Sequence, residues 1–266
     1  METIGRNVLW SLDRFGKPAA KTNIQVRQTK GIKVKKFSQL ARLVAELQFR
    51  NRDFVLVFRG QSKDYLNEAK NTSLRPGIFR PVQGDGTVPA AEIIRRRFQR
   101  LETYDRQVVA RADAIFPERE VAERLRRQRI LRWSLLQHYE VCQTPLLDVT
   151  HSLRVAASFA SDKMGDEAFV FVLGIPNISG AVTASIEAGL QVIRLASVCP
   201  SNAVRPHIQE GYVLGEYPEV GNTEQKQNYD GFWSTAHCQI LLQSRSILGC
   251  QSRVSESAAR RSLSSR

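Results

Sequence analysis

One continuous apolar run limits the possible folds of this chain more than any other segment. Residues 53–58 read Asp-Phe-Val-Leu-Val-Phe, and Arg59, Gly60 and Gln61 follow directly. A short apolar run without the alternation of a half-exposed strand is typical of a strand that is buried on both faces. The sequence therefore predicts a central strand of a covered sheet, with an arginine and a glycine at its end.

Apolar side chains at helical spacing predict helices around this strand. We expect one helix from Phe37 to Leu47 with Ser38 as its N-cap, two Arg-rich helices between residues 90 and 138, and a small-residue helix at 155–160. Further strands are expected at three places, and a last segment fits either type: 168–175, 191–196 and 211–214, then 238–248. Residues 83–86 have the composition of a turn. These segments predict an α/β (α+β) protein whose central mixed sheet is flanked by helices.

The net charge of +13 is concentrated outside the predicted sheet. Residues 1–50 carry +8, residues 95–132 carry +6 with twelve arginines and no lysine, and residues 251–266 carry +3. Residues 17–36 show little periodicity, so we expect residues 1–36 to form an extended basic arm. The arginines of 95–132 have two interpretations: a solvated helix surface, or a face for nucleic acid or an acidic protein.

The spacing of the cysteines and the hydropathy of the chain indicate the cellular compartment in which the protein is expected. The four cysteines lie far apart without CxxC spacing: Cys142, Cys199, Cys238 and Cys250. We therefore expect reduced thiols and no metal site. No run approaches the roughly 20 apolar residues of a membrane helix, and the first residues do not resemble a secretion leader. We expect a cytoplasmic protein without a membrane partner, and a disordered tail at 251–266, which has too few apolar residues to fold.

Three sequence segments, taken together, resemble the FRG family, which is named for a Phe/Tyr-Arg-Gly motif. The first is Phe58-Arg59-Gly60-Gln61, followed at loop distance by Leu74-Arg75-Pro76-Gly77-Ile78-Phe79-Arg80. The second is Leu136-Gln137-His138-Tyr139, which runs into Thr144-Pro145-Leu146-Leu147-Asp148-Val149-Thr150 and the helix at 155–160. The third comprises Arg205, Gln209, Gly211 and the apolar strand that follows. The chain departs from the family pattern at Glu140, where Gly is usual, and at Val149, where Trp is usual.

The resemblance implies an organisation for the whole chain. An FRG domain would span residues 37–215 and include the Arg-rich helices of 90–138. The basic arm of 1–36 would precede it. Residues 216–250 would form elements packed on the domain, and the tail of 251–266 would follow.

The same segments are more distantly similar to the layout of ADP-ribosyltransferases. That layout has an apolar strand ending in Arg-Gly, a Thr/Ser-rich turn before a small-residue helix, and a Gln or Glu before a strand. It implies a pocket for NAD in which Arg59 grips phosphates or ribose and Thr150 or Ser152 holds the nicotinamide ribose. Gln209 would replace the acid that stabilises the oxocarbenium-like transition state. Because Gln209 lacks a negative charge, binding without turnover is an open alternative.

The candidate site therefore has one catalytic candidate, Gln209, and seven candidates for cofactor binding: Arg59, Gly60, Gln61, His138, Tyr139, Thr150 and Ser152. Several have structural alternatives. Arg59 could pair with the carboxylate of Asp148 or of another acid, and Asp148 or Thr150 could cap the helix near Ser152. His138 could be a hydrogen-bonded core histidine.

Two kinds of function are consistent with the sequence. The first is an FRG-domain protein with a pocket for NAD or another nucleotide, including an ADP-ribosyltransferase-like enzyme with a toxin or antiphage role. The second is a non-catalytic basic module that binds nucleic acid or an acidic protein.

Overall fold

The computed structural model describes eleven segments of the chain. These segments are 9–13, 15–28, 31–66, 72–81, 89–115, 118–162, 167–177, 179–186, 188–199, 204–222 and 237–243. The predicted turn at 83–86 and the predicted tail at 251–266 lie outside them.

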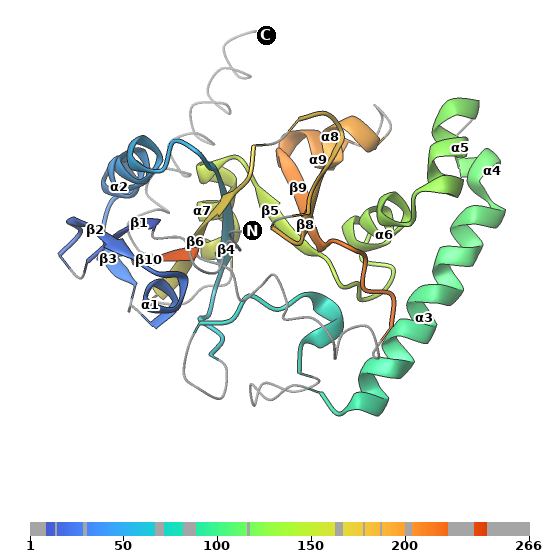
Figure 1. The fold of residues 1–266 in the computed structure, drawn as a ribbon, viewed down its shortest axis with the longest axis horizontal. Coiled ribbons are helices and arrows are strands. Elements are labelled where there is room, and N and C mark those ends of the chain that lie inside the picture. The colour runs from blue at the N-terminus through green and yellow to red at the C-terminus, as the bar shows by residue number, and fades with distance from the viewer. Residues whose placement is uncertain are drawn as a thin grey trace, which may run out of the picture.

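An eight-stranded sheet forms the centre of the molecule (Figure 1). Its strand order is β3-β10-β6-β4-β5-β9-β8-β7. The strands are β3 (Ile32–Val34), β4 (Val55–Gln61), β5 (Leu147–Thr150), β6 (Glu167–Ile175), β7 (Val182–Ser185), β8 (Leu190–Arg194), β9 (Gly211–Glu216) and β10 (His237–Gln243). β3 and β10 are parallel, and the other neighbouring pairs are antiparallel wherever a register is described. The sheet is therefore mixed, and the predicted α+β class is confirmed.

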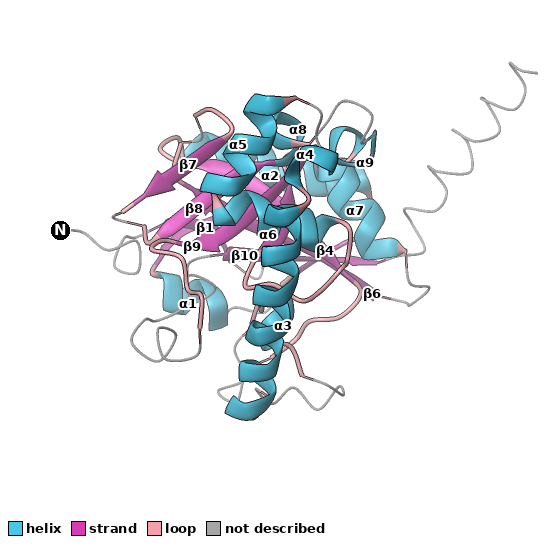
Figure 2. Ribbon diagram, turned by 90° about the vertical axis from the view of Figure 1, so that its right-hand side faces the viewer, coloured by secondary structure: helices cyan, strands magenta, loops and turns pink. Residues whose placement is uncertain are grey.

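Helices surround this sheet at both of its ends (Figures 1 and 2). The helices are α1 (Asn23–Gln28), α2 (Phe37–Arg50), α3 (Ala91–Ala110), α4 (Ala112–Ile115), α5 (Arg119–Arg127), α6 (Arg129–His138), α7 (Leu153–Ser161), α8 (Leu195–Val198), α9 (Val204–Ile208) and the 3-10 turn η2 (Gly77–Phe79). In Figure 1, α1 and α2 lie at the β3–β10 end, whereas α6 lies beside β8, and α3, α4 and α5 lie on the far side of α6.

Strand β4 is covered on both faces, as its continuous apolar run predicts. Leu56 and Phe58 belong to a core cluster with α2 and α7, whereas Val57 belongs to a cluster with β5, β6 and β8. All three side chains are buried. Because strand side chains alternate between faces, Arg59 leaves β4 on the same face as Val57.

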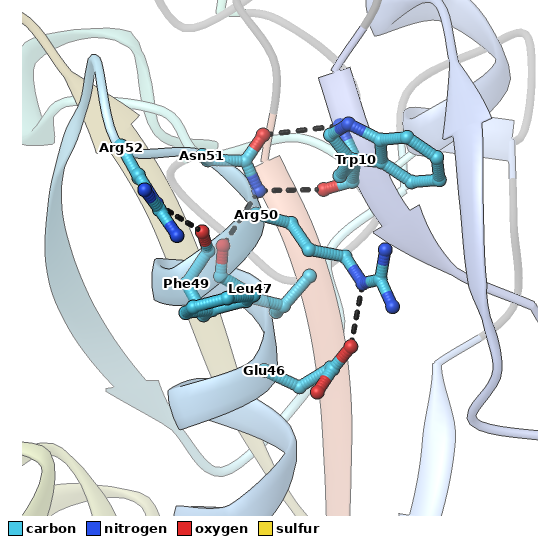
Figure 3. Close-up of polar contacts among 7 residues, drawn as sticks. All are labelled: Trp10, Glu46, Leu47, Phe49, Arg50, Asn51 and Arg52. Carbon is cyan, nitrogen blue, oxygen red and sulfur yellow. Dashed lines mark hydrogen bonds and ion pairs between the residues drawn. The ribbon is translucent and has the colours of Figure 1, made fainter.

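The N-terminal segment is folded, so the predicted extended arm is wrong within its described part. β1 (Leu9–Leu12) and β2 (Pro18–Lys21) form an antiparallel hairpin, α1 follows, and β3 joins the main sheet. Figure 3 shows how Asn51 holds the hairpin: its amide oxygen accepts from Trp10 N at 3.0 Å, and its Nδ2 donates to Trp10 O at 2.9 Å. The burial of Leu12, Val26 and Val34 explains why the segment does not stay extended.

The helices predicted from apolar spacing occur, with three local corrections. The second Arg-rich helix is two helices, α5 and α6, because Gln128 adopts an extended backbone between them. The N-cap of α2 is Lys36, and no side chain caps it, so the expected Ser38 cap is wrong. The strand predicted at 191–196 ends at Arg194 and continues as α8.

No helix within the described segments is long and apolar enough to cross a membrane.

Candidate functional site

A cavity of about 850 Å³ opens at the end of β4. Its walls come from β4, the η2 turn, α3, the C-terminal end of α6, β5, α7 and the α9–β9 turn. Five of the eight sequence-predicted site residues line it: Arg59, Gly60, His138, Thr150 and Gln209. Gln61, Tyr139 and Ser152 do not belong to its lining. The structure thus brings together residues that lie up to 150 positions apart in the sequence.

Arg59 lies at the point where β4 and β5 separate. The two strands share one register pair, Phe58 with Thr150, and Arg59 Nη1 donates to the main-chain oxygen of Asp148 at 2.5 Å. Arg59 Nε is buried and has no hydrogen-bond partner in the described part of the chain. Burial, and after it the charge of Arg80, lowers the pKa of Arg59 to about 10. The guanidinium therefore stays charged at neutral pH, with one buried donor available to a ligand.

Arg59 does tie β4 to β5, but through a backbone carbonyl, so the predicted pairing with the Asp148 carboxylate is wrong. That carboxylate instead accepts from Gln137 Nε2 at 2.6 Å, and Gln137 Oε1 accepts from Thr144 Oγ1 at 2.5 Å. The predicted capping role of Asp148 is also wrong, because Ser152 is the N-cap of α7 and its main-chain N–H donates to Thr150 Oγ1, not to Asp148. The Asp148 carboxylate therefore remains in the cavity wall as a counter-charge to the arginines.

Five further arginines line the cavity, and three of them come from the Arg-rich helix α3. The five are Arg80, Arg96, Arg97, Arg100 and Arg205, against two carboxylates, Glu140 and Asp148. Arg97 Nη1 donates to Ile78 O at 2.8 Å and to Arg80 O at 2.6 Å, which fixes α3 against the η2 turn. The cavity is therefore strongly basic. From the sequence, the arginines of residues 95–132 were expected on helix surfaces and not in the candidate pocket.

Most other arginines of α3 and α5 form ion pairs with nearby acids. Arg95 pairs with Glu92, Arg106 with Glu102, and Arg126 with Asp113. Arg119 and Arg127 both pair with Glu123. Paired surface charges of this kind agree with the solvated-surface interpretation for the part of these helices outside the cavity.

Thr150 connects β5 to the turn that carries Gln209. Its Oγ1 donates to the main-chain oxygen of Gln209 at 2.7 Å and accepts from Ser152 N at 2.9 Å. Gln209 is half-buried and lies in the turn between α9 and β9, before the strand begins. Glu210 has a positive φ of 44° and is exposed, and it does not line the cavity. The carboxylate of neighbouring Glu210 therefore does not replace the missing charge in the cavity.

His138 ends α6 as a buried residue in the cavity wall. Its Nε2 is buried and makes no hydrogen bond within the described segments. Burial, and after it the charge of Arg205, lowers the pKa of His138, with Asp148 and Glu140 acting in the opposite direction. The lowered pKa favours the neutral ring at pH 7, and within the described segments His138 is not the hydrogen-bonded core histidine of the structural alternative. Neighbouring Tyr139 is exposed.

Gly60 makes room for a helix rather than for a ligand. A Cβ at this position would lie 1.9 Å from Ala156 O and 2.7 Å from Ala160 N, both main-chain atoms of α7. The glycine of the Phe-Arg-Gly motif thus permits α7 to pack directly on β4.

Glu140 has a positive φ of 54°. In the family that the sequence resembles, Gly is usual at this position. A left-handed backbone favours Gly, which gives a physical reason for the usual residue. The side chain of Glu140 reaches Arg205 Nη2 at 3.3 Å, an exposed ion pair between two cavity-lining residues.

The cavity wall also contains Cys142, a free thiol. Burial raises the pKa of Cys142, like that of Cys199, to about 11. Because the thiolate is the reactive form, neither thiol is a good nucleophile at neutral pH. The described residues include no group of three or more His, Cys, Asp or Glu side chains that could hold a metal ion.

These features define an α+β protein with an arginine-lined cavity at the end of a central strand. Residues 55–168 match the model of the FRG domain. The chain therefore contains an FRG domain, which includes Arg59, His138 and Thr150 but not Arg205 or Gln209. No curated protein and no solved structure matches the chain.

Proposed function

We propose that the arginine-lined cavity binds a nucleotide through its phosphates. The observation that carries this proposal is the charge of the wall, where six arginines face two carboxylates around about 850 Å³. Guanidinium groups form charge-assisted, often bidentate hydrogen bonds with phosphate. The volume lies within the range of small-molecule and cofactor sites. NAD, the ligand that the transferase-like layout implies, is the first ligand to test.

Within this site, different residues suit the phosphates and the ribose groups of a dinucleotide. The buried, unpaired Nε of Arg59 offers a donor to a phosphate oxygen. The neutral ring of His138 and the amide of Gln209 suit uncharged groups such as ribose hydroxyls. Thr150 positions the Gln209 turn through its hydroxyl rather than offering that proton to a ligand.

The site supports binding more strongly than ADP-ribosyl transfer. In that reaction the C–N bond between nicotinamide and ribose breaks, nicotinamide leaves with the bonding electrons, and an acceptor supplies the new bond and loses a proton. The transition state is cationic at the ribose, and a nearby negative charge stabilises it. Of the two lining carboxylates, Glu140 pairs with Arg205, whereas Asp148 accepts from Gln137 and offsets the charges of Arg59 and Arg80.

Calorimetric titration of NAD into the wild type tests the proposal, with Arg59→Ala as the site variant. Loss of one charge-assisted contact costs about 1.5–3 kcal/mol, or roughly tenfold or more in affinity. Arg106→Ala is the matched control, because Arg106 is exposed, pairs with Glu102 and does not line the cavity. Thermal melts of all three proteins separate lost binding from lost folding. Failure of NAD, ADP-ribose and ATP alike to bind the folded wild type contradicts the proposal.

Binding of nucleic acid or an acidic protein is the competing function. It would use exposed cations such as Lys35 and Lys36, and its affinity would fall steeply with salt. Replacing both lysines by Gln should weaken such binding and leave nucleotide binding unchanged, whereas Arg59→Ala should do the reverse.

A further inference from the structure

We infer that the cavity selects nucleotides by the length of their phosphate chain, so that a nucleoside triphosphate binds more tightly than NAD. This inference rests on the proposed nucleotide site and names its ligand class more narrowly.

The first argument is the charge that the wall leaves unpaired. Arg205 pairs with Glu140, and Arg96 pairs with Glu92, with 3.4 Å between Arg96 Nε and Glu92 Oε1. The remaining four cavity arginines form no ion pair within the described segments: Arg59, Arg80, Arg97 and Arg100. Asp148 is the one lining carboxylate without an ion-pair partner in those segments. The unpaired charge of the wall is therefore about +3, with neutral His138 adding none.

The second argument is the arrangement of these four cations, which we call the arginine row: all four line the cavity, and three of them come from the adjoining η2 turn and helix α3. Arg59 and Arg80 line the same cavity, and burial, followed by the charge of Arg80, lowers the pKa of Arg59. Arg97 is joined to Arg80 by its hydrogen bond to the Arg80 carbonyl at 2.6 Å. Arg100 follows Arg97 by three residues on α3, which places both on the same helix face. A row of adjacent cations complements consecutive phosphates better than phosphates that are separated by ribose.

The third argument compares this row with the charge of NAD. The diphosphate of NAD carries two negative charges, and its nicotinamide ring carries a positive one. Asp148 is the one unpaired acid of the described lining, and it offsets the charges of Arg59 and Arg80, so the described lining offers no further acid for that ring. A triphosphate chain without magnesium carries about four negative charges, and it can neutralise the whole row. Because like charges close together repel, the ligand with the most negative charge relieves the repulsion among the cavity arginines most.

A calorimetric series at about 50 mM salt with EDTA tests this inference, using AMP, ADP, ATP, ADP-ribose, NAD and NADP. Affinity should rise about tenfold with each phosphate from AMP to ATP, since each adds a charge-assisted contact. ATP should bind at least tenfold more tightly than NAD or ADP-ribose, and more tightly than NADP, whose third phosphate is separate. Inorganic tripolyphosphate should displace ATP. Equal or tighter binding of NAD than ATP overturns the inference but leaves the nucleotide site intact.

A matched pair of helix variants locates the effect. Within the described segments the Arg100 side chain makes no hydrogen bond and lies over the Tyr104 ring, 5.6 Å from its centroid, so Arg100→Gln should fold normally. We expect Arg100→Gln to lose about tenfold in ATP affinity while ADP-ribose affinity changes less than threefold. Arg106→Gln, on the same helix but outside the cavity, should change neither. An Arg100→Gln variant that keeps the full preference for ATP contradicts the proposed role of the arginine row. Absence of binding by any of the nucleotides would instead refute the proposed function itself.

Discussion

The guanidinium of Arg59 donates a 2.5 Å hydrogen bond to the main-chain oxygen of Asp148. This bond joins two strands that share a single register pair, whereas β4 and β6 share seven. One arginine thus supports the opening between the strands and presents a buried Nε without a partner in the described structure. The motif arginine has a structural role and a proposed binding role at once, and variants at this position need a folding control.

Gly60 should tolerate no side chain. In Gly60→Ala the new Cβ would meet the backbone of α7 at 1.9 Å, so the helix must move, and we expect a loss of about 3 kcal/mol in the free energy of unfolding. Gly77→Ala is the control, because its Cβ would meet ordinary contacts at 3.7 Å or more from Gln143. Urea denaturation of both variants measures the difference. Similar stabilities would show that α7 does not depend on this close approach.

Arg132 should be essential to the packing of α3, α5 and α6. Its Nε and Nη2 bond both oxygens of buried Asp105 at 2.7 and 2.9 Å, and its Nη1 donates to Leu125 O at 2.6 Å. Arg132→Met leaves Asp105 as an unpaired buried charge, at a cost of about 3–5 kcal/mol.

The double variant Arg132→Met with Asp105→Leu should recover much of that loss, because it removes both charges. Exposed Arg106→Met should change stability by less than about 0.5 kcal/mol. Thermal and urea denaturation of the set measures the coupling. Purely additive effects would contradict a buried ion pair.

Much of the fold follows from the sequence because its signals are local. The continuous apolar run of β4 and the helical spacing of α2 and α3 each reflect a face that must be buried, and both elements occur as predicted. The N-terminal hairpin was missed because its stability comes from long-range contacts, such as the bonds from Asn51 to Trp10. No periodicity within residues 17–36 encodes those contacts.

The candidate site was predictable in part for the same reason. The motifs located Arg59, Thr150 and Gln209, which line one cavity. Arg97 and Arg100 were hidden among other arginines, since only the three-dimensional packing of α3 distinguishes the cavity face from the ion-paired face. Arg80 and Arg205 lie within the motif segments. Their positions could have indicated that they line the site, but net charges summed over long stretches of sequence do not distinguish single arginines.

Stability should fall in mild acid because of His138. Its pKa is lowered in the folded protein, so the unfolded chain binds more protons at and below the ordinary value of about 6.5. The stability contribution of the neutral ring is therefore complete above that pH and is lost as the pH falls toward the folded value.

Melting temperatures from pH 8 to pH 5 test this prediction. The decline should be shallower in His138→Gln than in the wild type, while His207→Gln, on an exposed side chain, should follow the wild type. Identical profiles for all three proteins would show that His138 protonates freely in the fold.

Gln209→Glu should separate binding from turnover. A carboxylate there would stabilise a cationic ribose in the transition state, so nicotinamide release from NAD should rise, while NAD affinity stays within about threefold. Gln209→Ala should show neither gain. Chromatographic measurement of nicotinamide checks both variants, and equal rates for wild type and Gln209→Glu would mean that the turn does not reach the reacting ribose.

The central claim is that the arginine-lined cavity holds the phosphates of a nucleotide, and a crystal structure with ADP-ribose tests it most directly. The account predicts a diphosphate oxygen about 2.7–2.9 Å from Arg59 Nε, the length of a charge-assisted hydrogen bond, with the ligand between β4 and α3. A bound ADP-ribose whose phosphates lie outside this cavity, with Arg59 Nε still unbonded, would contradict the account.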